Sequence, residues 1–298
     1  MQRSACRTLP FLLTVVILLP GCIGYRHEQA FYVSPFNANS GGYHPLPLLA
    51  DSARTAIYGQ AEYFFGVANE RRNDHLEGGR GAVYIAHRFG AFQCYGGLDL
   101  SLGHYNVGIW DSSAFMPFWA YAPPQQFERL NTYAGSKFFG GTGFSGAVDW
   151  SVPLGGGDEW RVIGVETALY REFGDYHDFR AKLPDDLATL NVRDRFYGMA
   201  GLTTEIVGKF QDGELGLSLA RGWALGRSYN YLNTIDSLHK KLLEYEYFSA
   251  SCHFTVARIT GYAQLDVGTK TAAFRLGLVY RMTRSRLRHF GYGRPYLR

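Results

Sequence analysis

Hydrophobic and polar residues alternate with a period of two along much of this chain. In residues 92–104 the even positions are mainly apolar and the odd positions mainly polar, and the same alternation returns in residues 259–268 and 271–282. A two-residue period places apolar side chains on one face of a strand and polar side chains on the other. These three stretches therefore predict β-strands of one common design.

The same pattern predicts further strands at residues 55–68, 81–89, 129–152, 160–173, 196–209, 214–225 and 245–256. Within the third of these, the sequence Gly-Gly-Thr-Gly at 140–143 is either a hairpin turn or part of one long strand. A single long strand makes the connections alternate mostly between long and short, and it makes the strand count even. We therefore predict about ten strands, within a range of ten to twelve.

Alternating loop lengths and an even strand count are typical of an antiparallel transmembrane up-and-down β-barrel, with short turns on the periplasmic side and long loops outside. The predicted fold class is thus all-β, with short helices in the long outer loops. Arg221 falls on the apolar face, so we predict that it lies near a rim or that a bulge turns it inward. The polar face predicts a barrel-interior network of Glu62, Asp99, Glu166, Glu205, Asp266, Arg275 and Arg281.

A competing fold stays open at this stage. A soluble, lipocalin-like ligand-binding barrel would also show alternating strands, but its apolar face would point inward. Arg161 and Arg171 flank an apolar run, which favours the membrane barrel because arginines at strand ends can reach the two lipid interfaces.

The beginning of the chain predicts export. Arg3 and Arg7 precede an apolar run from Leu9 to Leu19, which is too short for a membrane-spanning helix and typical of a signal peptide. The next residues resemble a bacterial lipobox, in which Leu19, Gly21 and Cys22 fit and Pro20 departs. The resemblance implies acylation of Cys22, with palmitate or a similar fatty acid.

The lipobox, the aromatic-rich stretch 31–39 (FYVSPFNAN) and the strands that follow resemble a group of uncharacterised bacterial outer-membrane β-barrel proteins, some of them lipidated. The resemblance implies location in the outer membrane, with the lipid anchor on the periplasmic side. The expected organisation is a signal peptide (1–21), a lipidated periplasmic tether (22–54), the barrel (55–282) and a basic periplasmic tail (283–298).

Composition and charge restrict the partners. The net charge of +4 is too small to indicate a nucleic-acid partner. The tail holds five arginines and no acid, so it is either solvated or bound to an anionic lipid or cell-wall polymer. The loop 105–128 either folds over the barrel mouth or presents an aromatic patch to a glycan, peptide or protein partner. The aromatic residues concerned are Trp110, Phe115, Phe118, Trp119 and Tyr121.

No known catalytic motif stands out. Ser251 and His253 share a strand face, but nothing in the sequence supplies a third member for a catalytic group. Asp175, His177 and Asp178 are interpreted as a solvated loop, so neither a metal nor a cofactor is expected. We expect a non-enzymatic structural or surface-interaction barrel. A narrow channel for a small polar solute is the second interpretation, and a lipid-modifying enzyme the last.

Overall fold

The structure of the chain is a computed structural model. It describes residues 30–35, 43–47, 54–69, 74–109, 124–188, 190–210, 213–225, 246–268 and 271–283. The predictions for the signal peptide, for Cys22, for the aromatic residues between 110 and 121, and for the tail from 284 onward fall outside this part of the chain.

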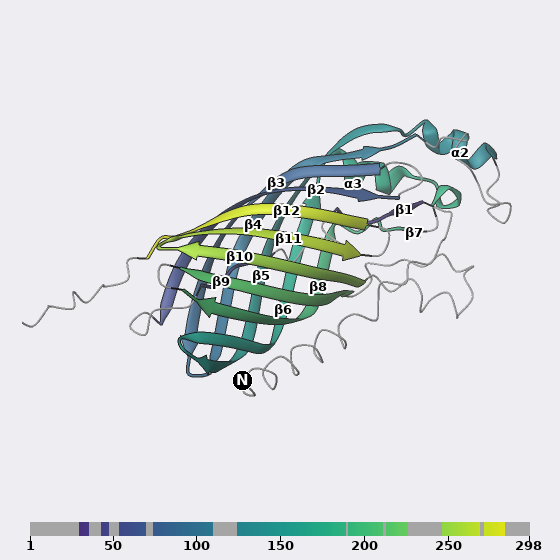
Figure 1. Cartoon of the computed structure of the whole chain (residues 1–298). Coiled ribbons are helices and arrows are strands. Elements are labelled where there is room, and N and C mark those ends of the chain that lie inside the picture. The colour runs from purple at the N-terminus through teal and green to yellow at the C-terminus, as the bar shows by residue number, and fades with distance from the viewer. Residues whose placement is uncertain are drawn as a thin grey trace, which may run out of the picture.

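Ten antiparallel strands close into a single barrel (Figure 1). Going around the barrel, the order is β10-β11-β12-β2-β3-β4-β5-β6-β8-β9, and β9 pairs with β10 to close it. This confirms the predicted up-and-down barrel and the count of ten. The strands are β2 (Thr55–Ala68), β3 (Asp74–Phe89), β4 (Phe92–Val107), β5 (Gly135–Gly155), β6 (Asp158–Phe173), β8 (Phe196–Lys209), β9 (Glu214–Leu225), β10 (Glu246–Val256), β11 (Ile259–Gly268) and β12 (Thr271–Arg281).

The Gly-Gly-Thr-Gly sequence lies inside β5, so the interpretation as one long strand is confirmed. Two predicted boundaries are wrong. β3 begins at Asp74, which shortens the predicted long loop 69–80, and residue 129 belongs to helix α2 (Pro124–Asn131), so β5 starts only at Gly135. Residues 74–80 are mostly glycine and polar residues. The alternation of apolar and polar positions that predicts a strand is therefore absent there.

The barrel has two different ends. The strand ends that the connections 90–91, 156–157, 210–213 and 257–258 join form the short-turn end. The strand ends that 108–134, 174–195 and 226–245 join, together with those joined by the shorter 69–73 and 269–270, form the opposite, long-loop end. Gly155, Gly156 and Gly157 have φ angles of 87°, 69° and 95°. Residues other than glycine rarely adopt these values, so the turn favours glycine at all three positions.

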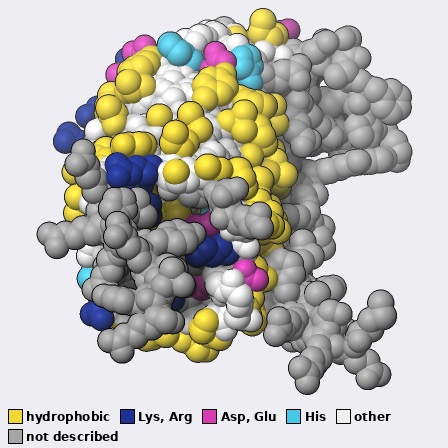
Figure 2. Space-filling model, turned by 60° about the vertical axis from the view of Figure 1, so that its left-hand side comes forward, with side chains coloured by type: hydrophobic (Ala, Val, Ile, Leu, Met, Phe, Trp, Pro, Cys, Tyr) yellow, Lys and Arg dark blue, Asp and Glu magenta, His cyan; other side chains and the backbone are white. Residues whose placement is uncertain are grey.

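Large apolar side chains cover the outside of the barrel (Figure 2). Leu98 on β4 is 69% exposed, and its cross-strand neighbours Val83 and Phe144 are 52% and 49% exposed. The alternative of a soluble barrel with its apolar face inward is therefore wrong. No helix among the described residues is long and apolar enough to cross a membrane.

A β-bulge in β6 turns the side chain of Arg161 from the outer face of the barrel to the lumen. Ser151 pairs with Arg161 and Trp150 pairs with Ile163, so one residue of β6 is skipped. Residues 161 and 163 therefore point to opposite faces, and Arg161 is buried in the lumen while Ile163 faces outward. The prediction that Arg161 reaches a lipid interface is wrong for this reason, whereas Arg171 does face outward, over the ring of Phe196.

A small cap covers the long-loop end. Helix α3 (Asp175–Lys182), a 3₁₀ turn (Asp185–Leu187) and the two-residue strand β7 (Leu190–Asn191) pack over the barrel mouth (Figure 1). Arg180 holds them together, since it donates hydrogen bonds to the Val192 carbonyl (2.6 Å) and to Glu172. Helix α3 and the 3₁₀ turn are short helices in the long connection 174–195, which agrees with the predicted fold class.

The N-terminal segment enters this cap. Strand β1 (Phe31–Tyr32) pairs in parallel with β7, and Tyr32 packs edge-on against Phe179, with ring centroids 5.0 Å apart. Burial raises the pKa of Tyr176 on α3 well above its ordinary value, so its hydroxyl stays protonated and donates to the Val33 carbonyl at 3.0 Å. Residues 30–35, which belong to the predicted tether, thus pack at the long-loop end of the barrel.

Candidate functional site: the barrel interior

Residues 43–47 (Tyr-His-Pro-Leu-Pro) lie inside the barrel; we call them the plug segment. Pro45 and Pro47 have no backbone N–H, so the segment is poorly suited to pairing as a strand. Side chains of the barrel wall instead bind its carbonyl groups. Gln60 donates to the Tyr43 carbonyl (2.9 Å) and Tyr84 to the Pro45 carbonyl (2.8 Å).

Tyr43 binds one side of the barrel wall. Its backbone N–H donates to Gln264 on β11 at 2.7 Å, and its hydroxyl donates to Glu205 on β8 and contacts Nδ1 of His253 on β10. Its ring lies edge-on to Tyr262 on β11, with centroids 5.8 Å apart. The Tyr43 side chain thus contacts three strands of the consecutive group β8-β9-β10-β11.

His44 faces a different group of strands. Its Nε2 accepts a hydrogen bond from Arg80 on β3 (2.9 Å) and lies 3.3 Å from the Ser145 hydroxyl on β5. The ring packs between Tyr84 and Tyr95, with centroids 5.0 and 4.9 Å away. Because Nε2 accepts from a guanidinium group, this contact favours the neutral imidazole.

Leu46 lies nearer the short-turn end. Its side chain is 2% exposed and packs in a cluster with residues at the start of β2 and the end of β12, among them Ala56, Tyr58 and Val279. Its carbonyl accepts a hydrogen bond from Arg161. The plug segment therefore runs along the lumen from mid-barrel toward the short-turn end.

Two groups of ion pairs line the wall around the plug segment. In the first, Arg275 binds Glu62 and also Asp266, with its Nε 3.0 Å from the Asp266 carboxylate, while Arg80 binds Asp99 through Nε at 3.0 Å. In the second, Arg161 binds Glu205 and lies 3.4 Å from Glu159. The three arginines are almost fully buried. Buried charges are tolerated where they are paired in this way.

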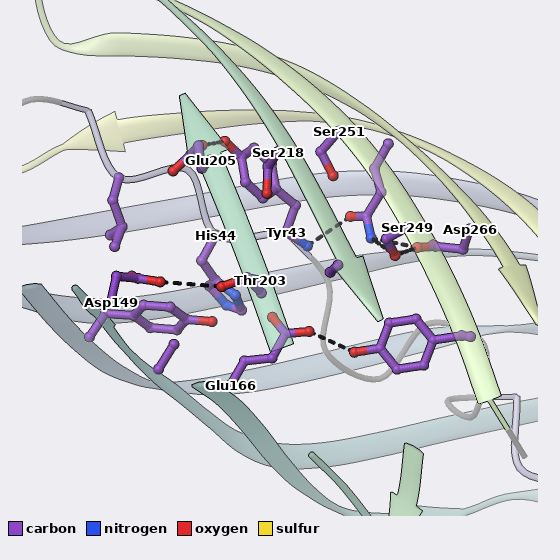
Figure 3. Close-up of a pocket in the computed structure, with 16 residues that line it drawn as sticks. Tyr43, His44, Asp149, Glu166, Thr203, Glu205, Ser218, Ser249, Ser251 and Asp266 are labelled. Atoms are coloured by element: carbon purple, nitrogen blue, oxygen red, sulfur yellow. Dashed lines mark hydrogen bonds between the residues drawn. The ribbon is translucent and has the colours of Figure 1, made fainter. Parts of the chain in front are cut away.

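A cavity of about 50 Å³ remains beside the plug segment (Figure 3). That volume holds roughly three or four water molecules. Asp149 and Glu166 face it, and their hydrogen bonds come from the Thr203 hydroxyl (3.3 Å) and the Tyr247 hydroxyl (2.6 Å). This cavity is thus small, and carboxylates face it.

Glycines allow large side chains to lie flat on the inner wall. A Cβ atom at Gly216 would approach the His253 ring to 2.0 Å, and one at Gly277 would approach the Tyr262 ring to 2.3 Å. Both glycines are direct cross-strand partners of these rings. The two rings that contact Tyr43 are therefore positioned by the absence of a side chain on the neighbouring strand.

Six of the seven residues predicted for the interior network point into the lumen: Glu62, Asp99, Glu166, Glu205, Asp266 and Arg275. The seventh, Arg281, lies half-buried at the last residue of β12, and its Nη2 is 3.5 Å from the Ala257 carbonyl. Arg221 stays on the outer face near the long-loop rim, as one of the two predicted placements had it. There Arg221 pairs with Glu246 at 2.6 Å and lies 5.4 Å from the Trp223 ring.

Sequence reasoning missed four central residues: Tyr43, His44, Arg80 and Arg161. Arg80 was placed in a loop, and the bulge in β6 concealed the inward direction of Arg161. Nothing in the local pattern of Tyr43 and His44 indicates a lumen position, since they precede the first strand. One signal in the sequence points to such residues. The predicted polar face has more carboxylates than arginines, so further hydrogen-bond donors are required inside the barrel.

Ser251 and His253 both face the lumen. Nδ1 of His253 lies 3.3 Å from Glu205 and contacts the Tyr43 hydroxyl. Ser251 lines the cavity. Cys94 and Cys252 are free thiols on different strands, β4 and β10. His177 donates a hydrogen bond from Nε2–H to the Arg193 carbonyl (3.1 Å). Among the described residues, no group of three or more histidine, cysteine or acidic side chains is arranged to hold a metal.

The closed strand order, the apolar outside and the charged, hydrogen-bonded inside define a β-barrel of the type that spans a lipid bilayer. No protein-family model and no curated protein sequence matches the chain. Among solved structures, the chain is similar to an outer membrane channel from Pseudomonas putida F1, with 11% identity, a TM-score of 0.37 and coverage of 81% of this chain and 98% of that chain.

It is also similar to the translocator domain of the autotransporter NalP from Neisseria meningitidis, with 10% identity, a TM-score of 0.35 and coverage of 77% and 89%. Neisserial surface protein A gives 8% identity, a TM-score of 0.32 and coverage of 77% and 97%. At these values the assignment of the fold rests on the strand pairing and the apolar outer face described above.

Proposed function

We propose that the chain is a non-enzymatic barrel of the bacterial outer membrane, with its lumen closed by its own plug segment. Its role in this proposal is structural or is the presentation of surface loops to a partner. The observation that carries the proposal is the bonding of Tyr43 and His44 to strands on several sides of the lumen. A solute would have to displace these contacts in order to pass.

The bilayer is the partner with the most direct physical support. Exposed Leu98, Leu169 and Leu278 belong to a continuous apolar exterior that water solvates poorly. Closure leaves no strand edge, which lipid requires because an unpaired backbone group costs several kcal/mol there. In this proposal the lipid on Cys22 is a second anchor, in addition to the barrel itself. Two lipid chains on that residue would bind a membrane far more firmly than one.

The loop aromatic residues Trp110, Phe115, Phe118, Trp119 and Tyr121 remain a proposed contact surface for a glycan, peptide or protein. The basic tail after residue 283 remains a proposed contact for anionic lipid or cell-wall polymer. Both proposals rest on composition alone.

A narrow channel is the second candidate function. The acidic cavity beside the plug segment favours it, because carboxylates such as Asp149 and Glu166 attract small cations or polar solutes. This function requires the plug segment to move.

Planar-bilayer recording separates the two functions. We expect the inserted wild-type barrel to show no steady single-channel openings, because the plug segment occupies the lumen. A variant in which residues 43–47 are replaced by Gly-Ser-Gly-Ser-Gly is expected to open to discrete conductance levels.

Ser251→Ala is the matched control, since Ser251 lines the same cavity without contributing to the plug segment; it is expected to stay closed. Steady openings of the wild-type protein would contradict the closed-barrel proposal and favour the channel.

A further inference from the structure

Three landmarks fix the path of the chain before β2. Residues 30–35 pack in the cap, where Tyr32 contacts Tyr105 near the long-loop end of β4. Residues 43–46 lie inside the lumen and approach the short-turn end at Leu46. The carbonyl of Arg54 accepts a hydrogen bond from the Arg88 N–H at the short-turn end itself (2.8 Å). In sequence order the chain therefore passes from the long-loop end to the short-turn end.

The length of the chain limits where Cys22 can lie. Ala30 lies eight positions after Cys22 in the sequence, and a fully extended chain of eight steps spans at most about 28 Å. Strand β2 has 14 residues. With a rise of ~3.3 Å per residue and a tilt of about 40°, a strand of that length corresponds to a barrel height of roughly 35 Å. Cys22 cannot reach the short-turn end from Ala30, and the plug segment already occupies the lumen.

We infer that the chain is threaded through its own barrel, so that its N-terminal residues, with the acylated Cys22, emerge at the long-loop mouth. Long loops of outer-membrane barrels face the exterior. The fatty acids therefore enter the outer leaflet, at the cell surface. The position of the lipid rests on the proposed acylation, whereas the threading rests only on residues 30–35, 43–47 and 54.

Threading makes the N-terminal segment part of barrel closure. Tyr43 and His44 contact both early strands, β2 and β3, and late strands, β10 and β11. Strand β12 pairs with β2, so the closed barrel surrounds this segment. The segment thus connects the surface anchor to the packing of the interior.

Surface labelling of intact cells tests the inference. One variant carries a short epitope between Glu28 and Gln29, and its matched control carries the same epitope after Arg298. We expect antibody to stain intact cells only for the first variant, with the control stained after permeabilisation of the outer membrane. A heat-shifted band on gels verifies that each barrel has folded.

Staining of the first variant only after permeabilisation would overturn the threading. If the epitope prevents folding, a cysteine-labelling readout replaces it. Glu28→Cys, in a chain with Cys94→Ala and Cys252→Ala, is labelled on intact cells with a membrane-impermeant maleimide, and the same chain with Glu28 retained gives the background from Cys22. Labelling of intact cells no higher than this background would again overturn the inference. Metabolic labelling with palmitate in wild type and Cys22→Ala tests acylation separately. If Cys22 is not acylated, the surface-labelling result still tests the threading.

Discussion

Replacing residues 43–47 by Gly-Ser-Gly-Ser-Gly is expected to lower the free energy of unfolding by about 3–8 kcal/mol. Truncation of a buried leucine such as Leu46 costs about 2–5 kcal/mol, and loss of the Tyr43 hydroxyl and the His44 ring leaves buried groups of the wall unpaired at about 1–3 kcal/mol. Glu205 and Arg80 are the groups most affected, since both bind the plug segment directly.

Denaturant unfolding of the reconstituted barrel, read by the heat-shifted band on gels, measures this change. Ser251→Ala is again the control and is expected to change the free energy of unfolding by less than about 1 kcal/mol. A plug-replacement variant as stable as wild type would show that the segment contributes nothing to the interior.

Arg275→Met is expected to destabilise the barrel by about 3–5 kcal/mol, because it leaves buried carboxylates without their cation. Arg275 is 1% exposed and binds both Glu62 and Asp266. Adding Glu62→Gln to the Arg275→Met chain is expected to restore part of the loss, since it removes one of the two carboxylate charges that Arg275 neutralised and leaves Asp266 and the weaker Arg80–Glu62 contact (3.8 Å) as the only changes nearby.

The matched control is Arg171→Met. Arg171 faces outward and lies 5.9 Å from the Phe196 ring, so its replacement is expected to cost no more than about 1 kcal/mol. The same unfolding measurement reads all three variants. Equal effects at 171 and 275, or no rescue by Glu62→Gln, would contradict the interior ion-pair network.

The strands could be predicted because lipid and lumen impose opposite chemistry on alternate residues. The alternation of apolar and polar residues predicts that Glu62, Asp99 and Asp266 share the polar face of their strands. In the structure that face points into the lumen, and all three side chains are buried there. This rule holds only while each residue advances the strand by one step. At the bulge in β6 one residue is skipped, so the same rule misplaces Arg161.

The plug segment could not be predicted from local pattern. Tyr43-His44-Pro45-Leu46-Pro47 shows no alternation, and two prolines favour a loop. Its position depends on donors and acceptors from strands that lie far away in sequence, such as Gln264, which is 221 residues from Tyr43. Only the closed barrel brings those groups together around one segment.

The presence of the plug segment in the lumen is tested most directly by a double-mutant cycle between Tyr43→Phe and Glu205→Gln. The Tyr43 hydroxyl donates to the Glu205 carboxylate across the lumen. We expect a coupling energy of about 1–3 kcal/mol in the free energy of unfolding, as for a buried hydrogen bond to a charged group. A coupling energy below about 0.5 kcal/mol, the range found for residues that do not touch, would contradict the account.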